Sequence, residues 1–515
     1  MSPLSADLLL YGGRVLTLDP RYPEAEAVAI ENGKILAVGS KRELKPLLAS
    51  HTQLLSCRGE TVLPGFIDPH LHLFAWASRF RGIDLGAVRS IVAMRQELTA
   101  HLQRTRAGDW MRGYGYDEFF LADKRHPTRR DLDLVSSDRP ILLRHRTGHA
   151  AVLNSVALHR VGIARDFHSP LGGFVERDVT GEPTGILYEM ESFLRTVIPR
   201  LAHADFAIGL KQAGAELLHQ GVTSFHDASV GNTLEDFDAF RRLHEDGTLV
   251  SRATIMIGSE TLPRLIEDGL LPFAGDEHVR LGSIKIMLHE SRGVITPSPE
   301  KVAEIVRIAH QHGFQVAIHA VEESPICIAL NAIAQAQENF FRADHRHRIE
   351  HCSLCPPPLV DALVETGGAV VTQPGFLHAY GEKYAAEIVP DLHGWLYRTK
   401  SLLERGIPVA GSSDCPISPV APLVGISAAM TRRSRSDTVL NQDESLSLFD
   451  ALSLFTSMGA WVGFEEEKKG RISPGMMADL AIIDGDMTTL APAEIGELNV
   501  RMTIIDGKVV WDAAD

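Results

Sequence analysis

The stretch Leu63–Phe74, LPGFIDPHLHLF, places two histidines one residue apart in an otherwise apolar run. Side chains at positions i and i+2 of a β-strand lie on the same face, so His70 and His72 point into one space. Two neighbouring imidazoles on one face of a buried strand are unusual, because buried strands are mostly aliphatic. The stretch therefore predicts a strand, and a site that uses the two rings.

Seven further apolar runs follow at steps of roughly thirty residues, and helical patterns such as PEKVAEIVRIAHQHG fill the gaps between them. The runs begin at Gly221, Val250, Arg280, Phe314, His347, Ala369 and Ile407. Regular alternation of strand and helix predicts a parallel sheet, and eight such strands close into an α/β fold, the (β/α)8 TIM barrel. The first gap is the exception, at about 150 residues. It predicts a large insertion, over about 78–200, after the first barrel strand.

The two ends of the chain carry the same hairpin pattern. AEAVAIENGKILAVGS contains two short strands around Asn32-Gly33, and RMTIIDGKVVW contains two more around Asp506-Gly507. The turn glycine supplies the positive φ that a type I′ turn requires. Because isolated hairpins are marginally stable, we expect these pieces to pair into a small β-sandwich domain built from both termini, residues 1–60 and 470–515, with the barrel spanning 61–469.

The composition excludes several classes of partner. The 515 residues carry a formal charge of −15, which argues against nucleic acid or an anionic membrane surface. No apolar run is long enough to span a bilayer, and the first residues lack the pattern of a secretory signal. Five cysteines do not indicate a disulfide framework, so we interpret Cys352 and Cys355 as core thiols and expect a cytoplasmic location. The charged run EEEKKGR from Glu465 is interpreted as a solvated helix end.

Polar side chains stand at the ends of four predicted strands. His70 and His72 end the first strand, His319 the fifth, His351 the sixth and Asp414 the eighth. The carboxyl ends of barrel strands meet at one face, where active sites form. Imidazole nitrogen and carboxylate oxygen are the donors that suit Zn²⁺ and similar divalent metals. These five residues therefore predict a metal site.

At these residues the sequence resembles the amidohydrolase superfamily, through PGFIDPHLH, a histidine closing the fifth strand, EH at the sixth and SSD at the eighth. GHAAVLNSVAL, GEPTGILYE, GVTSFHD, VTQPGF and VAGSSDCPIS resemble its YtcJ-like branch, called amidohydrolase 3, which includes N-substituted formamide deformylases. The resemblance covers essentially the whole chain. It implies a distorted metal-dependent hydrolase barrel with a small β-sandwich built from both termini.

The resemblance also implies a ligand that strand spacing does not reveal. Lys285, in GSIKIMLHE, matches a lysine that ends the fourth strand in this superfamily and is often carbamylated to bridge two metals. The implied cofactors are two Zn²⁺ ions per chain with a carbamylated Lys285. The alternatives are an ordinary lysine at a strand end, and Glu290 as a substitute bridge.

The chain departs from the branch beside the expected site. His289, Glu290 and Ser291 stand where the branch usually has Asp-Gly-Ser, and Glu322 and Glu323 stand where it favours Gly-Asp. The substrates of characterised relatives therefore do not transfer to this chain.

Four residues are weaker candidates for contact with the substrate. His149, in TGHAAVLN, lies in the insertion and is equally interpretable as a packing or capping residue. Gln373 ends the seventh strand and so faces the same space as the metal ligands. His289 and Glu322 follow the fourth and fifth strands.

The expected reaction is hydrolysis of a non-peptide carbon–nitrogen bond, in an amide, formamide or similar group of a small molecule, by attack of a metal-bound hydroxide. Asp414 is placed to accept the proton of the water and hand it to the departing amine. Dimers are common in the superfamily, so the resemblance allows a homodimer without establishing one.

Two other functions stay open. His319-Ala-Val-Glu322 also matches the HxxE of mononuclear zinc deaminases of amino-substituted rings, in which the glutamate shuttles protons. That alternative predicts one metal and no role for Lys285. A catalytically inactive amidohydrolase-like binding protein is the third interpretation, and degradation of the metal ligands would mark it. This sequence keeps every expected ligand.

Overall fold

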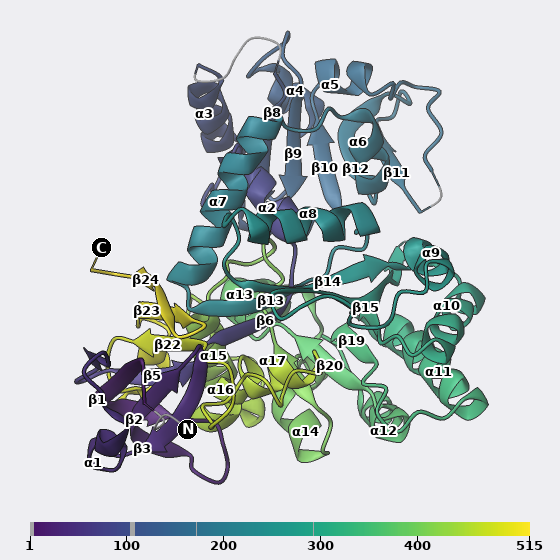
Figure 1. Cartoon of the computed structure of the whole chain (residues 1–515). Helices are drawn as coiled ribbons and strands as arrows, with labels where there is room; N and C mark the ends of the chain where they lie inside the picture. The colour runs from purple at the N-terminus through teal and green to yellow at the C-terminus, as the bar shows by residue number, and fades with distance from the viewer. Residues whose placement is uncertain (1–4, 104–108, 171, 292, 515) are drawn as a thin grey trace. The chain divides into compact units, whose positions relative to one another are not determined.

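The computed structural model describes residues 5–103, 109–170, 172–291 and 293–514. The chain forms two compact units, Met1–His72 with Gly214–Asp515, and Leu73–Ala213 (Figure 1). The first unit contains a barrel of parallel strands and a sheet made by both termini. The second unit is the long segment between the first two barrel strands. The predicted fold class, including the insertion, is confirmed.

All eight predicted barrel strands are present, parallel and in the predicted order. They are β6 (Phe66–Leu71), β13 (Val222–Asp227), β14 (Arg252–Gly258), β15 (Val279–Met287), β18 (Val316–Ala320), β19 (Arg348–His351), β20 (Ala369–Thr372) and β21 (Val409–Gly411). Almost every residue in them is buried. This continuous burial is what parallel strands covered on both faces require.

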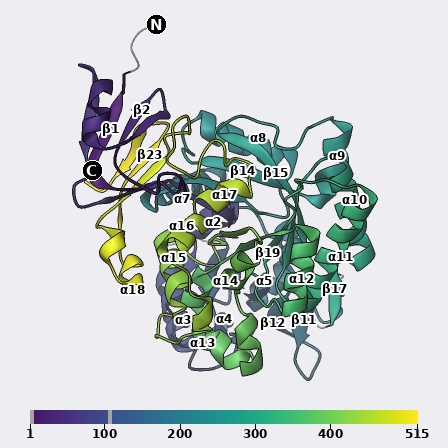
Figure 2. The same cartoon turned by 90° about the horizontal axis from the view of Figure 1, so that it is seen from below.

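Helices connect the strands from β13 onward. They are α8 (Leu234–Glu245), α9 (Leu262–Glu267), α10 (Pro299–Gln311), α11 (Glu323–Asn339), α12 (Pro357–Thr366), α13 (Gly375–Glu387) and α14 (Thr399–Glu404), followed by α15 (Pro422–Thr431), α16 (Leu448–Leu454) and α17 (Ser457–Trp461). Figure 2 shows α10, α11 and α12 side by side along the outside of the strands. Thr233 and Ser298 fix the starts of α8 and α10, because each side chain accepts a hydrogen bond from a backbone N–H of the first turn.

The barrel closes where its first and last strands meet. The His70 carbonyl accepts a hydrogen bond from the Asp414 N–H at 2.8 Å, and the His72 N–H donates to the Cys415 carbonyl at 2.7 Å. The buried Asp68 carboxylate adds a clamp, because it accepts from the N–H of Ser413 at 3.2 Å. These bonds join the ends of β6 and β21, which are far apart in the sequence.

The termini form one sheet with the strand order β24-β23-β22-β5-β1-β2-β3, and β4 pairs with β1. Its strands are β1 (Leu8–Leu16), β2 (Glu24–Glu31), β3 (Lys34–Gly39), β4 (Gln53–Ser56), β5 (Thr61–Pro64), β22 (Leu480–Ile483), β23 (Val500–Ile505) and β24 (Lys508–Asp512). Both predicted turns have positive φ at their two central residues, 51° and 74° at Asn32-Gly33 and 52° and 70° at Asp506-Gly507. Side chains from both termini share one core, for example Leu10 with Ile482.

The second unit is built on a six-stranded sheet with the order β11-β12-β10-β9-β8-β7 (Figure 1). Its strands are β7 (Ile83–Asp84), β8 (Met111–Tyr116), β9 (Ile141–His145), β10 (Ala150–Leu153), β11 (Phe174–Arg177) and β12 (Pro183–Tyr188). Its helices are α2 (Leu73–Arg79), α3 (Ile91–Leu102), α4 (Arg129–Asp133), α5 (Ser155–Arg160) and α6 (Glu191–Val197), and α7 (His203–His219) runs from this unit into the first. No helix in the described part of the chain has the length and apolar character needed to cross a membrane.

The interpretation of EEEKKGR as a solvated helix end is wrong. The segment forms turns, and Glu465 is only 3% exposed. Its Oε2 lies 3.1 Å from an Arg280 guanidinium nitrogen and 2.7 Å from Lys469 Nζ. Lys469 also donates to Ser224 Oγ at 2.9 Å. The carboxylate is buried because it neutralises two cations, one of them carried into the interior by β15.

Replacing Glu465 by glutamine should therefore destabilise the protein. Glu465→Gln leaves Arg280 and Lys469 buried without their counter-ion, and removing one partner of a buried ion pair costs about 3–5 kcal/mol. Urea denaturation should show a loss of this size in the free energy of unfolding. Glu467→Gln, at an exposed position in the same run, is the control and should stay within about 0.5 kcal/mol of wild type. Equal stability of the two variants would contradict the assigned ion pairs.

Candidate metal centre

The predicted ligands lie at the carboxyl ends of barrel strands. His70 is the residue before the last in β6, and His351 is the last residue of β19. Strand register brings His319 level with the end of β15, through the pair Met287 and His319. Asp414 follows β21 and is tied to β6 by the closing hydrogen bonds. The fold therefore delivers these side chains to one end of the barrel.

The donor atoms of these residues converge. Asp414 Oδ1 lies 3.5 Å from His70 Nε2 and 3.1 Å from His72 Nε2. Donor atoms of His70, His351 and Asp414 all lie within 4.8 Å of one another, and the His319 and His351 ring centroids are 4.4 Å apart. Two donors that bind one metal at about 2.0–2.2 Å are themselves roughly 3–3.5 Å apart. The spacing suits a shared divalent ion.

Three of the imidazoles have their second nitrogen, Nδ1, engaged by the protein. His70 Nδ1 is hydrogen-bonded to a Glu350 carboxylate oxygen, and His72 Nδ1 to Ser229 Oγ at 3.1 Å. His351 Nδ1 donates to Gln373 Oε1 at 2.7 Å. An imidazole whose Nδ1–H is donated to a protein acceptor presents the lone pair of Nε2 to a metal. Nε2 of His70 and of His72 faces Asp414 Oδ1, another predicted ligand, so a metal bound between them would replace this contact.

The charge states of the cluster suit metal ligation, which needs neutral imidazole and ionised carboxylate. Burial, followed by the nearby Lys285 ammonium, holds the pKa of His70 well below its usual range. Burial also lowers the pKa of His351. Although burial alone would raise it, the histidines His72, His70 and His351 hold the pKa of Asp414 well below its usual range.

Lys285 is a buried cation for which the described residues supply no hydrogen-bond acceptor. It lies on β15, beside Ala317 of β18, and is 2% exposed. Its Nζ has no hydrogen-bond partner among the described residues. Burial lowers the pKa of Lys285 to about 8, so part of the population is neutral near neutral pH. A buried amine without an acceptor is costly, and a chemical modification or an adjacent ligand would remove that cost.

Two candidate ligands sit in strained backbone. His351 has φ 74° and Asp414 has φ 54°, in the left-handed region that side chains other than glycine rarely adopt. Such conformations cost of order 1–3 kcal/mol each and are concentrated at functional sites. His351 is the last residue of β19 and Asp414 follows β21, so both strained residues lie at the carboxyl end of a barrel strand.

The residues considered for substrate contact near the barrel differ in exposure. Gln373 is fully buried, with its carbonyl engaged by His351 and its amide donating to Ser412 Oγ at 3.0 Å. Glu322 is exposed at the start of α11. His289 is half-buried in β16 (His289–Ser291), which pairs with β17 (Val294–Thr296). The adjacent Glu290 is exposed.

His149 belongs to the second unit, where it pairs with Glu189. Its Nδ1 lies 2.9 Å from Glu189 Oε1, and the histidine side chain is 39% exposed. Within this unit the contact explains the position of the ring, and a role in substrate binding stays a prediction.

Glu350 and Arg348 are site residues that the sequence did not single out. Both are fully buried on β19, and Arg348 Nε donates to Glu350 Oε1 at 2.5 Å while the other carboxylate oxygen bonds His70. The signal was present in RIEH, because two charged residues at positions i and i+2 of a buried strand point into the barrel. Asp68 was also missed, although it lies inside the opening motif.

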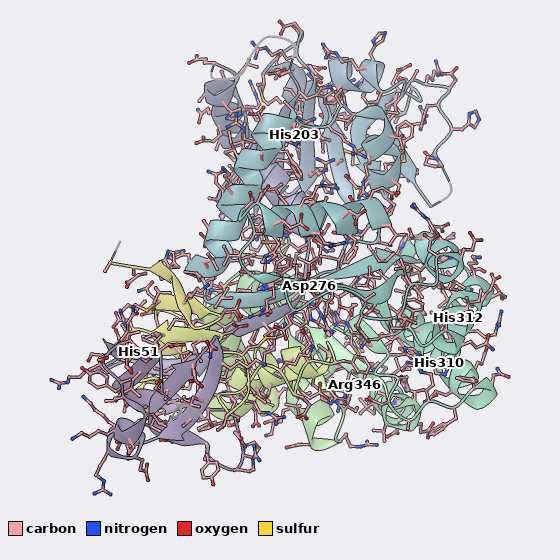
Figure 3. All side chains as sticks on the ribbon, in the orientation of Figure 1. His51, His203, Asp276, His310, His312 and Arg346 are labelled. Atoms are coloured by element: carbon pink, nitrogen blue, oxygen red, sulfur yellow. The ribbon has the colours of Figure 1, made fainter. Side chains whose placement is uncertain are left out.

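The chain contains another His-x-His pair, His345 and His347, whose rings serve as hydrogen-bonding residues of the fold. His347 Nδ1 accepts from the Val316 N–H at 3.0 Å, and its Nε2 lies 2.8 Å from His310 Nδ1. His345 Nδ1 accepts from the His347 N–H, and its Nε2 donates to the Thr366 carbonyl. Figure 3 places His310 among the helices around the barrel. Because the chain uses both nitrogens of each ring in the pair, neither is available to a metal.

The second unit contains a further cluster, made by His145 with Asp117 and Glu118. His145 Nδ1 accepts from the Thr147 N–H at 3.2 Å, so the proton of the neutral ring sits on Nε2. That nitrogen faces Glu118 Oε2 at 2.9 Å and Asp117 Oδ1 at 3.6 Å. Burial lowers the pKa of His145, but the two carboxylates outweigh it and raise the pKa overall. In the neutral ring the proton is therefore on the opposite nitrogen to that of His70, and the two carboxylates face it.

Comparisons with known proteins agree on one family. The profile described as "Amidohydrolase family" matches residues 53–511. The chain is 28% identical over 527 residues to putative amidohydrolase YtcJ of Bacillus subtilis (strain 168), covering 98% of this chain and 99% of that protein. It is 27% identical over 545 residues to N-substituted formamide deformylase of Arthrobacter pascens, covering 98% of each. The crystal structure of an uncharacterized metal-dependent hydrolase from Pyrococcus horikoshii OT3 superposes with a TM-score of 0.75 at 25% identity, covering 94% of this chain and 99% of that one.

The two His-x-His pairs allow a matched test of metal binding. His70→Asn with His72→Asn should remove most of the divalent metal that the protein retains after dialysis, as measured by elemental analysis. His345→Asn with His347→Asn removes two buried imidazoles at the same spacing and should leave metal content unchanged in the folded fraction. Retention of full metal content by the first variant would contradict the assignment.

Proposed function

The chain belongs to the amidohydrolase family, and from this premise we propose that it is a metal-dependent hydrolase that cleaves a carbon–nitrogen bond other than a peptide bond. The observation that carries the proposal is the convergence of imidazoles, a carboxylate and a buried lysine at the carboxyl end of the barrel. The proposed metal ligands are His70, His72, Lys285, His319, His351 and Asp414.

The donor set supports two divalent ions, for which Zn²⁺ is the best match to imidazole and carboxylate donors. Bound there, such ions would polarise the scissile carbonyl and make a water molecule more acidic. The neutral imidazoles contribute no charge, so the anions of the set must offset two dications. Asp414 supplies one negative charge, which is why the state of Lys285 matters.

We assign that second charge to a carbamate on Lys285. Neutral Nζ attacks carbon dioxide, a new N–C bond forms, and one proton is released to leave a carboxylate at the end of the side chain. The buried Nζ that lacks an acceptor and the pKa lowered to about 8 support this step, because only the neutral amine reacts. The carbamate would replace an unsatisfied cation by an anion long enough to reach two metals.

Asp414 is the proposed proton carrier. Its carboxylate lies among the imidazoles, accepts the proton of the attacking water, and passes it to the nitrogen of the departing amine. Without that proton the amine would leave as a poor anion. The histidines that lower its pKa keep Asp414 ionised at neutral pH, so the carboxylate carries no proton of its own before the reaction.

The proposed substrate is a small molecule with an amide, formamide or similar group. The similarity to N-substituted formamide deformylase over essentially the whole chain supports this class. His149, His289 and Glu322 remain proposed substrate contacts, whereas the buried amide of Gln373 supports a role in orienting His351. All five cysteines are free thiols, which supports the cytoplasm, a reducing compartment, as the location.

Asp414→Asn tests the proton carrier, because asparagine keeps an oxygen donor but cannot accept a proton. We expect kcat to fall by at least about 10²-fold, as for other general acid–base groups, with a much smaller loss of bound metal. The assay follows release of amine from a panel of N-substituted formamides and simple amides. Asp268→Asn, on the exposed end of α9, is the control, and near-normal turnover of Asp414→Asn would refute the role.

Lys285→Ala separates the hydrolase from the ring-deaminase alternative. If the carbamate bridges two metals, this variant should lose about one metal per chain and nearly all activity, and added acetate or propionate should restore part of both. Lys301→Ala, exposed on α10, should change neither. A deaminase predicts the reverse: Lys285→Ala remains active, Glu322→Gln is inactive, and ammonia is released from amino-substituted rings.

A further inference from the structure

We propose that Glu350 is a positioning residue for the metal centre, and that it acts through His70. Its carboxylate fixes the tautomer of the His70 ring. It also makes Nε2 of His70 a stronger metal ligand than Nε2 of His72 or His351. The inference rests on the proposed function. Glu350 is not one of the proposed ligands, and it influences the metal only through its hydrogen bond to His70.

The first support is the geometry of the contact. Glu350 Oε2 bonds His70 Nδ1, Glu350 is 0% exposed, and His70 is 1% exposed. A carboxylate can only accept hydrogen bonds, so the proton of the neutral ring must sit on Nδ1 and the lone pair on Nε2. Nε2 is the atom that faces Asp414 at 3.5 Å.

The second support is Arg348, which pairs with Glu350 and holds its carboxylate in place. Arg348 Nε donates to Glu350 Oε1 at 2.5 Å, and its two other nitrogens donate to the Pro69 carbonyl at 2.6 Å and to His226 Nδ1 at 3.2 Å. The guanidinium is therefore bound to the β6 backbone directly beside His70. Arginine and carboxylate together form a rigid support, because every group in the chain of contacts is buried and hydrogen-bonded.

The third support is the difference between the imidazole partners. Through Nδ1, His72 bonds a hydroxyl and His351 bonds an amide oxygen, both neutral, whereas Nδ1 of His70 bonds an anion. Hydrogen bonds with a charged acceptor are roughly twice as strong as neutral ones, and an anionic partner raises the basicity of the ring as a ligand. His70 is therefore the imidazole that Glu350 selectively strengthens.

A purely structural role predicts something different. If Glu350 only balances the charge of Arg348, its loss should lower stability without acting through His70. Glu350→Gln alone leaves Arg348 buried and unpaired, so that variant can fail for a structural reason. Glu350→Gln combined with Arg348→Met removes both charges and keeps similar volume, which preserves the charge balance of the interior while removing the anion from His70.

A double-mutant cycle on the full-length protein tests the proposal. The dissociation constant of Zn²⁺ is measured by competition with a chelator for wild type, His70→Asn, the Glu350→Gln/Arg348→Met pair, and the three changes combined. The pair should weaken binding of the tighter ion by about 10–100-fold in the wild-type background, the usual effect of removing an outer partner of a metal ligand. In the His70→Asn background it should have almost no further effect.

Each outcome is decisive. Additive losses in the two backgrounds, or unchanged affinity in the paired variant, would overturn the role of Glu350 while leaving the metal centre intact. Absence of stoichiometric Zn²⁺ from the wild-type protein would instead refute the proposed function. Glu444→Gln, which neutralises a different buried carboxylate that bonds Ser401, controls for the general cost of removing a buried charge and should leave Zn²⁺ affinity unchanged.

Discussion

The hydrogen bonds between β6 and β21 are the interaction on which the site depends. They join the Asp414 N–H to the His70 carbonyl and the His72 N–H to the Cys415 carbonyl, across more than three hundred residues of sequence. An open sheet would leave the first and last strands at opposite edges. Closing it brings the two histidines within 3.1–3.5 Å of the Asp414 carboxylate, so barrel closure and site assembly are one event.

A barrel interior that holds so many ionisable groups must balance them. Glu465 offsets Arg280 and Lys469, and Glu350 offsets Arg348. Lys285 has no such acceptor among the described residues, and it lies at the end of the barrel where the imidazoles gather. Lys285 therefore needs a partner that the described residues do not supply. This is the physical basis for the proposed carbamate and metal ions.

The sequence was sufficient for the barrel because its period is strong. Most barrel strands are largely apolar runs, and a polar residue near the end of such a run, such as His319, stands out against it. The terminal hairpins were predictable from the Asn-Gly and Asp-Gly turns. Glu465 was misassigned because a charged run is normally solvated, and only the fold shows that Arg280 enters the interior opposite it. Glu350 was missed since its importance depends on contact with His70, a residue distant in sequence.

The sequence also could not separate the two His-x-His pairs. His70 and His72 have the same spacing as His345 and His347, and what distinguishes them is the use of the ring nitrogens. In the second pair the chain occupies both nitrogens with groups that are not proposed ligands. In the first pair Glu350 and Ser229 bind Nδ1, and Nε2 of each ring faces Asp414, a proposed ligand of the same centre. Tautomer, which is set by tertiary contacts, decides between a ligand and a structural histidine.

The most direct test of the account is a crystal structure of the Zn²⁺-loaded protein with anomalous diffraction recorded on both sides of the zinc absorption edge. The account predicts two zinc peaks at the carboxyl end of the barrel, roughly 3.5–4 Å apart, with extra density on Lys285 Nζ between them. If crystals grown with excess Zn²⁺ show ordered side chains but no zinc peak beside His70, His72 and Asp414, the account is contradicted.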